Sequence, residues 1–229
     1  MLTRSLEEDG PRNDRARRLL LRALAALVLC MGAVLVCYEW IDRPVAFYVQ
    51  RHGINHIAFF RWLTLPPPLV QTWSPAVLAV LMIRRAWGPW AAWQYVLLVS
   101  CLSLIVADEF RTSLGDLCGR YWPETWFNNN PSLIGTSTYG FHPFRHGDDI
   151  GSFPSGHAAR IAGFAGVWWI AIPRASLLWA VLCPLMLVSL VVMNYHFVGD
   201  VVAGSVLGAI VAAYAADLAG IRGLRRQGA

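Results

Sequence analysis

Six apolar stretches, each close to the length that crosses a bilayer, constrain this chain more than any other feature. They cover residues 19–38, 69–83, 89–107, 158–172, 175–193 and 201–216. A membrane-spanning helix needs about 20 apolar residues, so the second and fourth stretches must extend into flanking residues or tilt little. With 56% hydrophobic and 14% charged residues, the composition is also far from that of a soluble domain. The sequence predicts an all-α, polytopic membrane bundle of about six transmembrane helices.

The polar segments around these stretches divide the chain into three parts. Residues 1–18 are charged and contain Pro and Gly, which predicts a disordered cytoplasmic tail. Residues 19–219 are expected to form the six-helix membrane domain, and residues 220–229 a basic cytoplasmic tail. Within the domain, residues 41–68 mix amphipathic pieces with a run of three prolines, which predicts a helix lying at the bilayer interface and then a turn. Three arginines of this segment are interpreted as interfacial anchors, namely Arg43, Arg51 and Arg61.

The distribution of arginine predicts how the chain is oriented in the membrane. All 19 basic residues are arginine, and most of them lie at the ends of apolar stretches instead of forming one basic surface, which argues against nucleic acid as a partner. If the amino terminus is cytoplasmic, Arg84, Arg85, Arg174 and the terminal arginines all lie inside, as the positive-inside rule requires. Both termini are therefore expected in the cytoplasm of an integral, multi-pass inner-membrane protein. The loop 108–156 and the turn near residue 196 would then face the periplasm or exterior.

The first candidate site is the segment Phe153-Pro154-Ser155-Gly156-His157 at the start of an apolar stretch. Proline and serine are ordinary start signals of a helix, so a plain cap is the alternative interpretation. A helix amino terminus also offers free N–H groups and the positive end of a dipole. A phosphate placed there would be held by the Ser155 hydroxyl and nearby amides, with His157 beside it.

The second candidate site is the pair His196 and Asp200, which are four residues apart and would share one face of a helix. A carboxylate bonded to one imidazole nitrogen fixes the tautomer and leaves the other nitrogen free to attack. A purely structural pair is the alternative. Because one helical hairpin separates His157 from His196, both histidines are expected at the same face of the membrane, where they can converge.

In these motifs the chain resembles the type 2 phosphatidic acid phosphatase and haloperoxidase superfamily, over roughly residues 70–218. Pro154-Ser155-Gly156-His157 resembles the central motif of that family, Ser189, His196 and Asp200 the last motif, and Gly119-Arg120-Tyr121-Trp122-Pro123 a weakened first motif. The resemblance implies that His196 attacks phosphorus and forms a phosphohistidine, that Asp200 orients it, and that His157 protonates the leaving oxygen. Ser155, the Gly156 amide and nearby arginines would stabilise the phosphoryl oxygens, and no metal or other cofactor is required.

The chain departs from the family pattern at three positions that normally carry a cation. Gly115 replaces the first-motif lysine, Trp122 the first-motif arginine and Leu190 the last-motif arginine. Since a bound phosphate still needs positive charge, other arginines are expected to substitute. The candidates are Arg120, two residues from a usual position, Arg111, one turn before Gly115, and Arg160, three residues after His157, for which helix pairing or snorkelling is the alternative.

The leading hypothesis is a membrane phosphatase that hydrolyses a lipid phosphomonoester or pyrophosphate at the outer face through a phosphohistidine. The alternatives are a lipid phosphotransferase with the same nucleophile, and a non-catalytic membrane protein with a degenerate site. The expected partners are a lipid phosphate and the membrane; the oligomeric state stays open. The loop 141–149 is interpreted as a lid over the site, with a metal cluster as the alternative. Gly204 and Gly208 form a GxxxG pattern that favours close helix packing over a dimer contact.

Overall fold

The computed structural model describes residues 2–126, 129–144 and 150–221, with side chains from residue 13 onward. In this part of the chain every regular element is a helix, which confirms the all-α prediction. The long helices are α1 (Leu2–Val36), α4 (Pro66–Arg85), α5 (Ala92–Cys118), α7 (Gly156–Ala171), α8 (Ser176–Val192) and α9 (Val198–Leu218). The shorter elements are the π-helix η1 (Cys37–Ile41), α2 (Asp42–Arg51), η2 (Ile54–His56), α3 (Ala58–Leu63), α6 (Leu133–Thr136) and η3 (Pro173–Ala175).

Five helical segments of the described chain are long and apolar enough to cross a membrane, one fewer than expected. They are Asn13–Arg51, Ala58–Arg85, Ala92–Cys118, Pro173–Val192 and Val198–Leu218. The expected fourth span is α7, which has 16 residues and rises about 24 Å, less than the roughly 30 Å hydrocarbon core. It stops at Ala171 because Pro173 follows directly. The chain is therefore an integral membrane protein, while a sixth span stays a prediction.

The amino-terminal segment differs from its prediction. Instead of a disordered tail over residues 1–18, α1 is helical from Leu2 and continues without a break into the first apolar stretch. The five arginines, two leucines and two glutamates of this segment favour a helix and here continue one that the apolar stretch already forms. Arg15 also forms an ion pair of 2.5 Å with Asp217 near the end of α9. Of the predicted basic tail 220–229, residues 222–229 lie outside the described residues.

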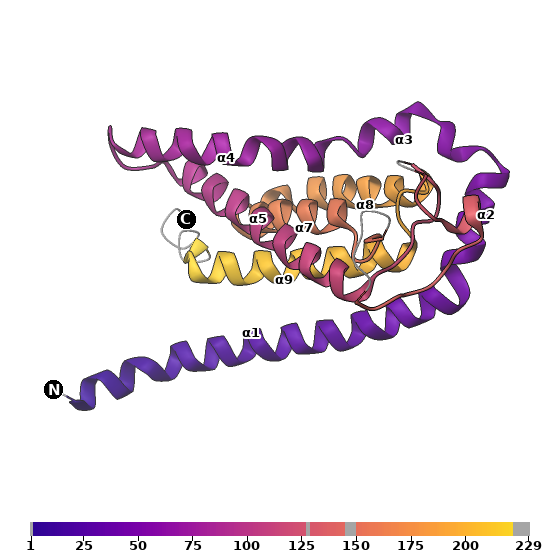
Figure 1. The fold of residues 1–229 in the computed structure, drawn as a ribbon. Coiled ribbons are helices and arrows are strands. Elements are labelled where there is room, and N and C mark those ends of the chain that lie inside the picture. The colour runs from indigo at the N-terminus through magenta and orange to yellow at the C-terminus, as the bar shows by residue number, and fades with distance from the viewer. Residues whose placement is uncertain (1, 127–128, 145–149, 222–229) are drawn as a thin grey trace.

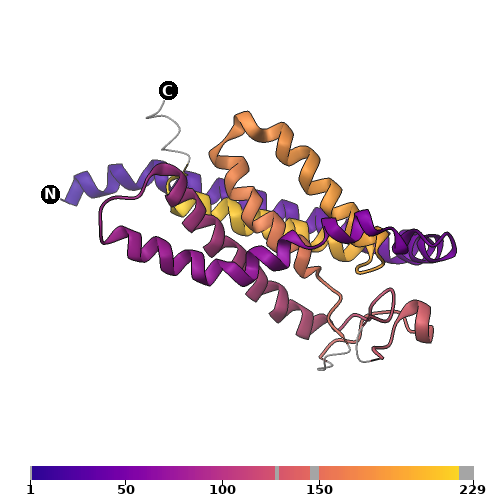
Figure 2. The same cartoon turned by 90° about the horizontal axis from the view of Figure 1, so that it is seen from above.

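Helix α7 lies at the centre of the bundle, packed against α5, α8 and α9 (Figures 1 and 2). Its contact with α9 is very close because glycines face it. A Cβ atom on Gly204 would lie 2.3 Å from the carbonyl oxygen of Ser155, and one on Gly208 would lie 2.3 Å from that of Ala159. The GxxxG pattern thus packs two helices of one chain, as predicted.

The two ends of the bundle differ in character (Figure 1). The start of α1, the end of α9 and the turn between α4 and α5 lie at one end. The opposite end carries α2, α3 and the long connection between α5 and α7. The predicted motif residues all lie toward this second end, which therefore carries the candidate site.

Candidate active site

His196 lies in the tight turn between α8 and α9, not on a helix as predicted, because α9 begins two residues later at Val198. Asn194 adopts a left-handed conformation with φ of 51° and donates to the carbonyl of Ala46 at 3.2 Å, which anchors the turn. The His196 ring is 2% exposed, and its Nδ1 lies 3.0 Å from the carbonyl oxygen of Ser152. A carbonyl can only accept, so Nδ1 carries the proton and Nε2 keeps its lone pair.

Asp200 supports this turn from the first turn of α9. Its carboxylate accepts hydrogen bonds from the Ser152 hydroxyl and, at 3.0 Å, from the Phe197 amide, which caps the helix. The Oδ2 atom lies 3.8 Å from Nδ1 of His196, so the carbonyl of Ser152 is the direct partner of the imidazole and Asp200 fixes both Ser152 and the turn.

Arg120 was expected at the substrate phosphate, but it lies behind Asp200 and is fully buried. Its guanidinium forms ion pairs of 2.5 Å with Asp200 and 2.6 Å with Asp42. These two carboxylates account for its position, since a buried guanidinium must be paired. Burial by itself would lower the pKa of Arg120, but the two carboxylates hold this pKa above its ordinary value. Four aromatic rings enclose the cation at 4.4–5.6 Å from their centroids, those of Tyr38, Tyr139, Phe141 and Phe197.

His157 and the start of α7 form the neighbouring wall of the site. The rings of His157 and His196 are 5.9 Å apart between centroids, so the two predicted histidines do converge. Ser155 is fully buried, and its hydroxyl accepts from the amide of Ala158 at 3.3 Å, as a helix cap does. Gly156 leaves room for Arg111, because a Cβ on Gly156 would lie 2.6 Å from Nε of Arg111.

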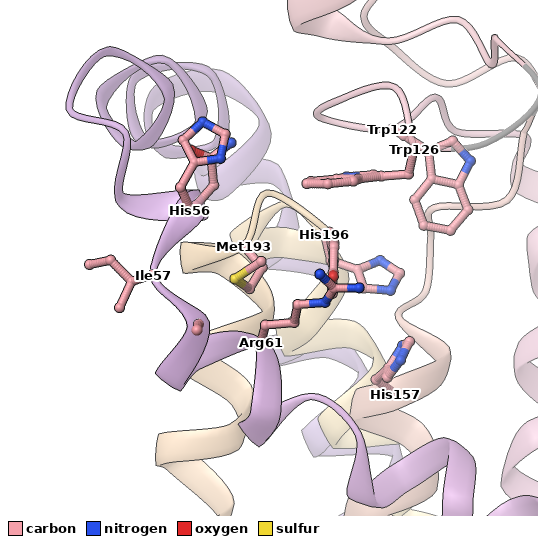
Figure 3. Close-up of a pocket in the computed structure, with 11 residues that line it drawn as sticks. His56, Ile57, Arg61, Trp122, Trp126, His157, Met193 and His196 are labelled. Carbon is pink, nitrogen blue, oxygen red and sulfur yellow. The ribbon is translucent and has the colours of Figure 1, made fainter.

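A cavity of about 600 Å³ opens over the two histidines. The ring of Trp122 lies above His196, at 5.2 Å between centroids, and Arg61 extends from α3 toward the same imidazole (Figure 3). The segment of η2 and α3 supplies five of the eleven lining residues. The full lining consists of Asn55, His56, Ile57, Ala58, Arg61, Trp122, Trp126, His157, Met193, Tyr195 and His196.

The other arginines expected at the phosphate are not part of this lining. Arg160 pairs with Asp108 of α5 at 2.8 Å, and Asp108 also accepts from Gln71 of α4, so Arg160 ties three helices together. Arg111 lies against the backbone of Gly156, just outside the cavity, and its Nε has no hydrogen-bond partner among the described residues. The predicted lid and the alternative metal cluster in loop 141–149 fall largely on residues 145–149, outside the described residues.

Two residues of the site have no motif that marks them in the sequence. Asp42 and Arg61 both lie in the segment predicted to anchor the chain at the interface. Asp42 follows directly on η1, is 1% exposed, and accepts from the Gly199 amide at 3.0 Å. The one sequence signal for Asp42 is that a carboxylate follows an apolar stretch, and this signal does not reveal that Arg120 is its partner.

This all-helical membrane bundle brings two histidines into one cavity, beside a buried aspartate and a capped helix amino terminus. These are the features expected of a phosphoryl-transfer site. The PAP2 superfamily profile matches residues 92–222, and the chain belongs to this superfamily. The matching region begins with α5 and contains all three motif segments, but not α3. Searches of curated proteins and of solved structures gave no match. Membership indicates a phosphatase that acts on phosphoesters.

Proposed function

We propose that this chain is a membrane phosphatase that hydrolyses a lipid phosphomonoester or pyrophosphate through a phosphohistidine on His196. The observation that carries the proposal is the hydrogen bond of 3.0 Å from His196 Nδ1 to the Ser152 carbonyl, at the floor of a cavity that His157 also lines. It leaves Nε2 as the nitrogen available for attack and fixes its direction.

The proposed reaction has two steps. Nε2 of His196 attacks phosphorus, the phosphorus–oxygen bond of the ester breaks, and His157 gives its proton to the leaving oxygen. His157 then takes a proton from water, the resulting hydroxide attacks the phosphohistidine, and free phosphate leaves. The ion pair of Asp200 with Arg120 keeps the imidazole in place in both steps.

The lipid substrate is supported by the surroundings of the cavity. Ile57, Phe59 and Trp62 lie on or beside α3 and are 46%, 56% and 70% exposed, although α3 borders the cavity. Apolar and aromatic side chains of this kind bury themselves at the level of lipid headgroups. A phosphate on a lipid headgroup would therefore reach the two histidines from the side of the bilayer.

A screen for phosphate release tests the activity. Purified protein is mixed with phosphatidate, phosphatidylglycerophosphate, polyprenyl pyrophosphate and lipid A phosphates, and His196→Ala serves as control. We expect free phosphate from at least one lipid with the native protein and none with the variant. Transfer of labelled phosphate to an acceptor lipid would instead support a phosphotransferase, and no reaction with any lipid would support the non-catalytic alternative.

We also propose that the end of the bundle with the site faces the periplasm or exterior. The arginines at the start of α1 and the end of α4 lie at the opposite end, as the positive-inside rule would place them. The test uses a background with the five native cysteines replaced by alanine. A cysteine at Asn129 should react with an impermeant thiol reagent in intact cells, and one at Arg85 should not. The reverse pattern would overturn the orientation.

A further inference from the structure

The cavity has to balance the charge of a phosphate with few cations. A phosphate monoester carries up to two negative charges near neutral pH. Two arginines near the site are already paired with carboxylates, Arg120 with Asp42 and Asp200, and Arg160 with Asp108. A third, Arg111, lies against Gly156 and does not line the cavity. Among the described residues that line the cavity, Arg61 is the one with a permanent positive charge.

The position of Arg61 on α3 directs it into the cavity. Ala58 and Arg61 are three residues apart and so share a face of the helix, and both line the cavity. In Figure 3 the side chain of Arg61 points from α3 toward His196, and both residues line the cavity. Among the described residues, none forms an ion pair or a hydrogen bond with this guanidinium. It is free to bind a ligand.

Arg61 enters the cavity from another part of the chain than the three positions that carry a cation in the family pattern, Gly115, Trp122 and Leu190. Trp122 lies over His196 from the loop after α5, and Leu190 is buried in the apolar contact of α8 with Ala158 and Val201. Gly115 is buried in α5 beside the carbonyl of Phe153. All three positions lie within residues 92–222, whereas Arg61 lines the cavity from α3.

We infer that Arg61 is the residue that binds the phosphoryl oxygens of the substrate in this chain, and that α3 thereby completes a site which residues 92–222 alone leave without a cation in the cavity. This inference rests on the proposed function, because it assigns Arg61 a role in the same reaction. The guanidinium donates through two parallel N–H groups, which match two oxygens of a phosphoryl group. Its charge also stabilises the transition state, in which the equatorial oxygens carry the negative charge.

Substitution of Arg61 tests the inference, with Arg51→Ala as the matched control. Arg51 ends α2 in the same interfacial segment, is also exposed, and does not line the cavity. For Arg61→Ala we expect kcat/KM for phosphate release to fall by about 10²–10³. Arg61→Lys should restore part of this loss, because it keeps the charge but not the fork. Added guanidinium chloride at low millimolar concentration should raise the activity of Arg61→Ala and leave Arg51→Ala unchanged.

A binding measurement keeps the test independent of turnover. The affinity of the detergent-solubilised protein for inorganic phosphate, followed by ³¹P NMR, should fall about 10–100-fold in Arg61→Ala and stay unchanged in Arg51→Ala. If the native protein released no phosphate from any lipid, the proposed function would fail. The difference in phosphate affinity would still test whether Arg61 binds phosphate. If the native protein is active and Arg61→Ala equals it in both kcat/KM and phosphate binding, the inference is overturned and the phosphatase stands.

Discussion

The guanidinium of Arg120 joins Asp200, beside the proposed nucleophile, to Asp42, which lies more than 150 residues earlier in the chain. All three side chains are fully excluded from solvent. Asp42 in turn accepts from the amide of Gly199, the residue before Asp200. The start of α2 is therefore bonded to the turn that holds His196, and the position of the imidazole depends on a segment outside the family region.

Arg120→Lys tests this connection. A single ammonium group cannot reach two carboxylates in the directions of a planar fork, so one of them loses its partner. We expect kcat to fall at least about tenfold and the thermal midpoint in detergent to fall, because breaking a buried pair costs about 3–5 kcal/mol. The control is Arg43→Lys, since Arg43 lies over the Tyr139 ring at 5.6 Å without belonging to the triad. Native values of kcat and midpoint in Arg120→Lys would contradict the proposed role.

Gly204→Ala tests the packing of α9 on α7. The added Cβ would lie 2.3 Å from the carbonyl of Ser155, so the helices must separate and the start of α7 must move with His157. We expect a loss of about 1–3 kcal/mol in stability together with a lower kcat. Gly32→Ala is the matched control, because a Cβ on Gly32 in α1 has nothing within 4 Å and should be neutral or stabilising. Equal stability of the two variants would argue against close packing as the reason for glycine.

The motif residues could be brought together from the sequence because the inference needed only helix lengths. A hairpin of two helices returns the chain to the same end of the bundle, so His157 and His196 were expected at one face, where they can converge. The pattern does not reveal which atom pairs with which. Nδ1 of His196 donates to the carbonyl of Ser152, a backbone group that no sequence motif marks. Oδ2 of Asp200 lies 3.8 Å from the same nitrogen.

The positions of Arg120 and Arg61 could not be predicted because both depend on distant parts of the chain. Arg120 is near a family position in sequence, yet it turns away from the cavity toward Asp42, whose partner no local pattern identifies. Arg61 looks like any interfacial anchor until the path of α3 beside α8 places it in the cavity. Tertiary structure thus keeps Arg120 out of the cavity lining and brings Arg61 into it.

Phe59→Ser together with Trp62→Ser tests whether α3 admits substrate from the bilayer. These residues are three apart on the exposed face of α3, so the change removes apolar area at the lipid interface and leaves Arg61 in place. We expect KM for a lipid phosphate in vesicles to rise about tenfold or more, and kcat/KM for soluble p-nitrophenyl phosphate to stay within about twofold. Trp87→Ser, at the opposite end of the bundle and 76% exposed in the native chain, should change neither. An equal loss for both substrates would indicate that α3 has merely been displaced.

The dependence of activity on pH should show where the proton of the general acid comes from. His157 lies outside the five candidate spans, and burial, together with the nearby His196, Arg160 and Arg111, lowers the pKa of His157 to about 3. A lowered pKa means that the proton is lost as pH rises through about 3, so His157 is neutral from pH 5 upward. The proton that His157 gives to the leaving oxygen must then enter the site on the substrate, which binds as the phosphate monoanion.

We therefore expect kcat/KM for an alkyl lipid phosphate to be flat below about pH 6 and to fall about tenfold per unit above it, since the second pKa of a phosphate ester is about 6. His157→Ala should lose nearly all activity toward the alkyl ester, because an alkoxide leaves poorly without a proton. It should keep much more activity toward p-nitrophenyl phosphate, whose leaving group needs no proton. A kcat/KM that rises between pH 6 and 8, or an equal loss for both substrates in His157→Ala, would show that His157 is not the general acid.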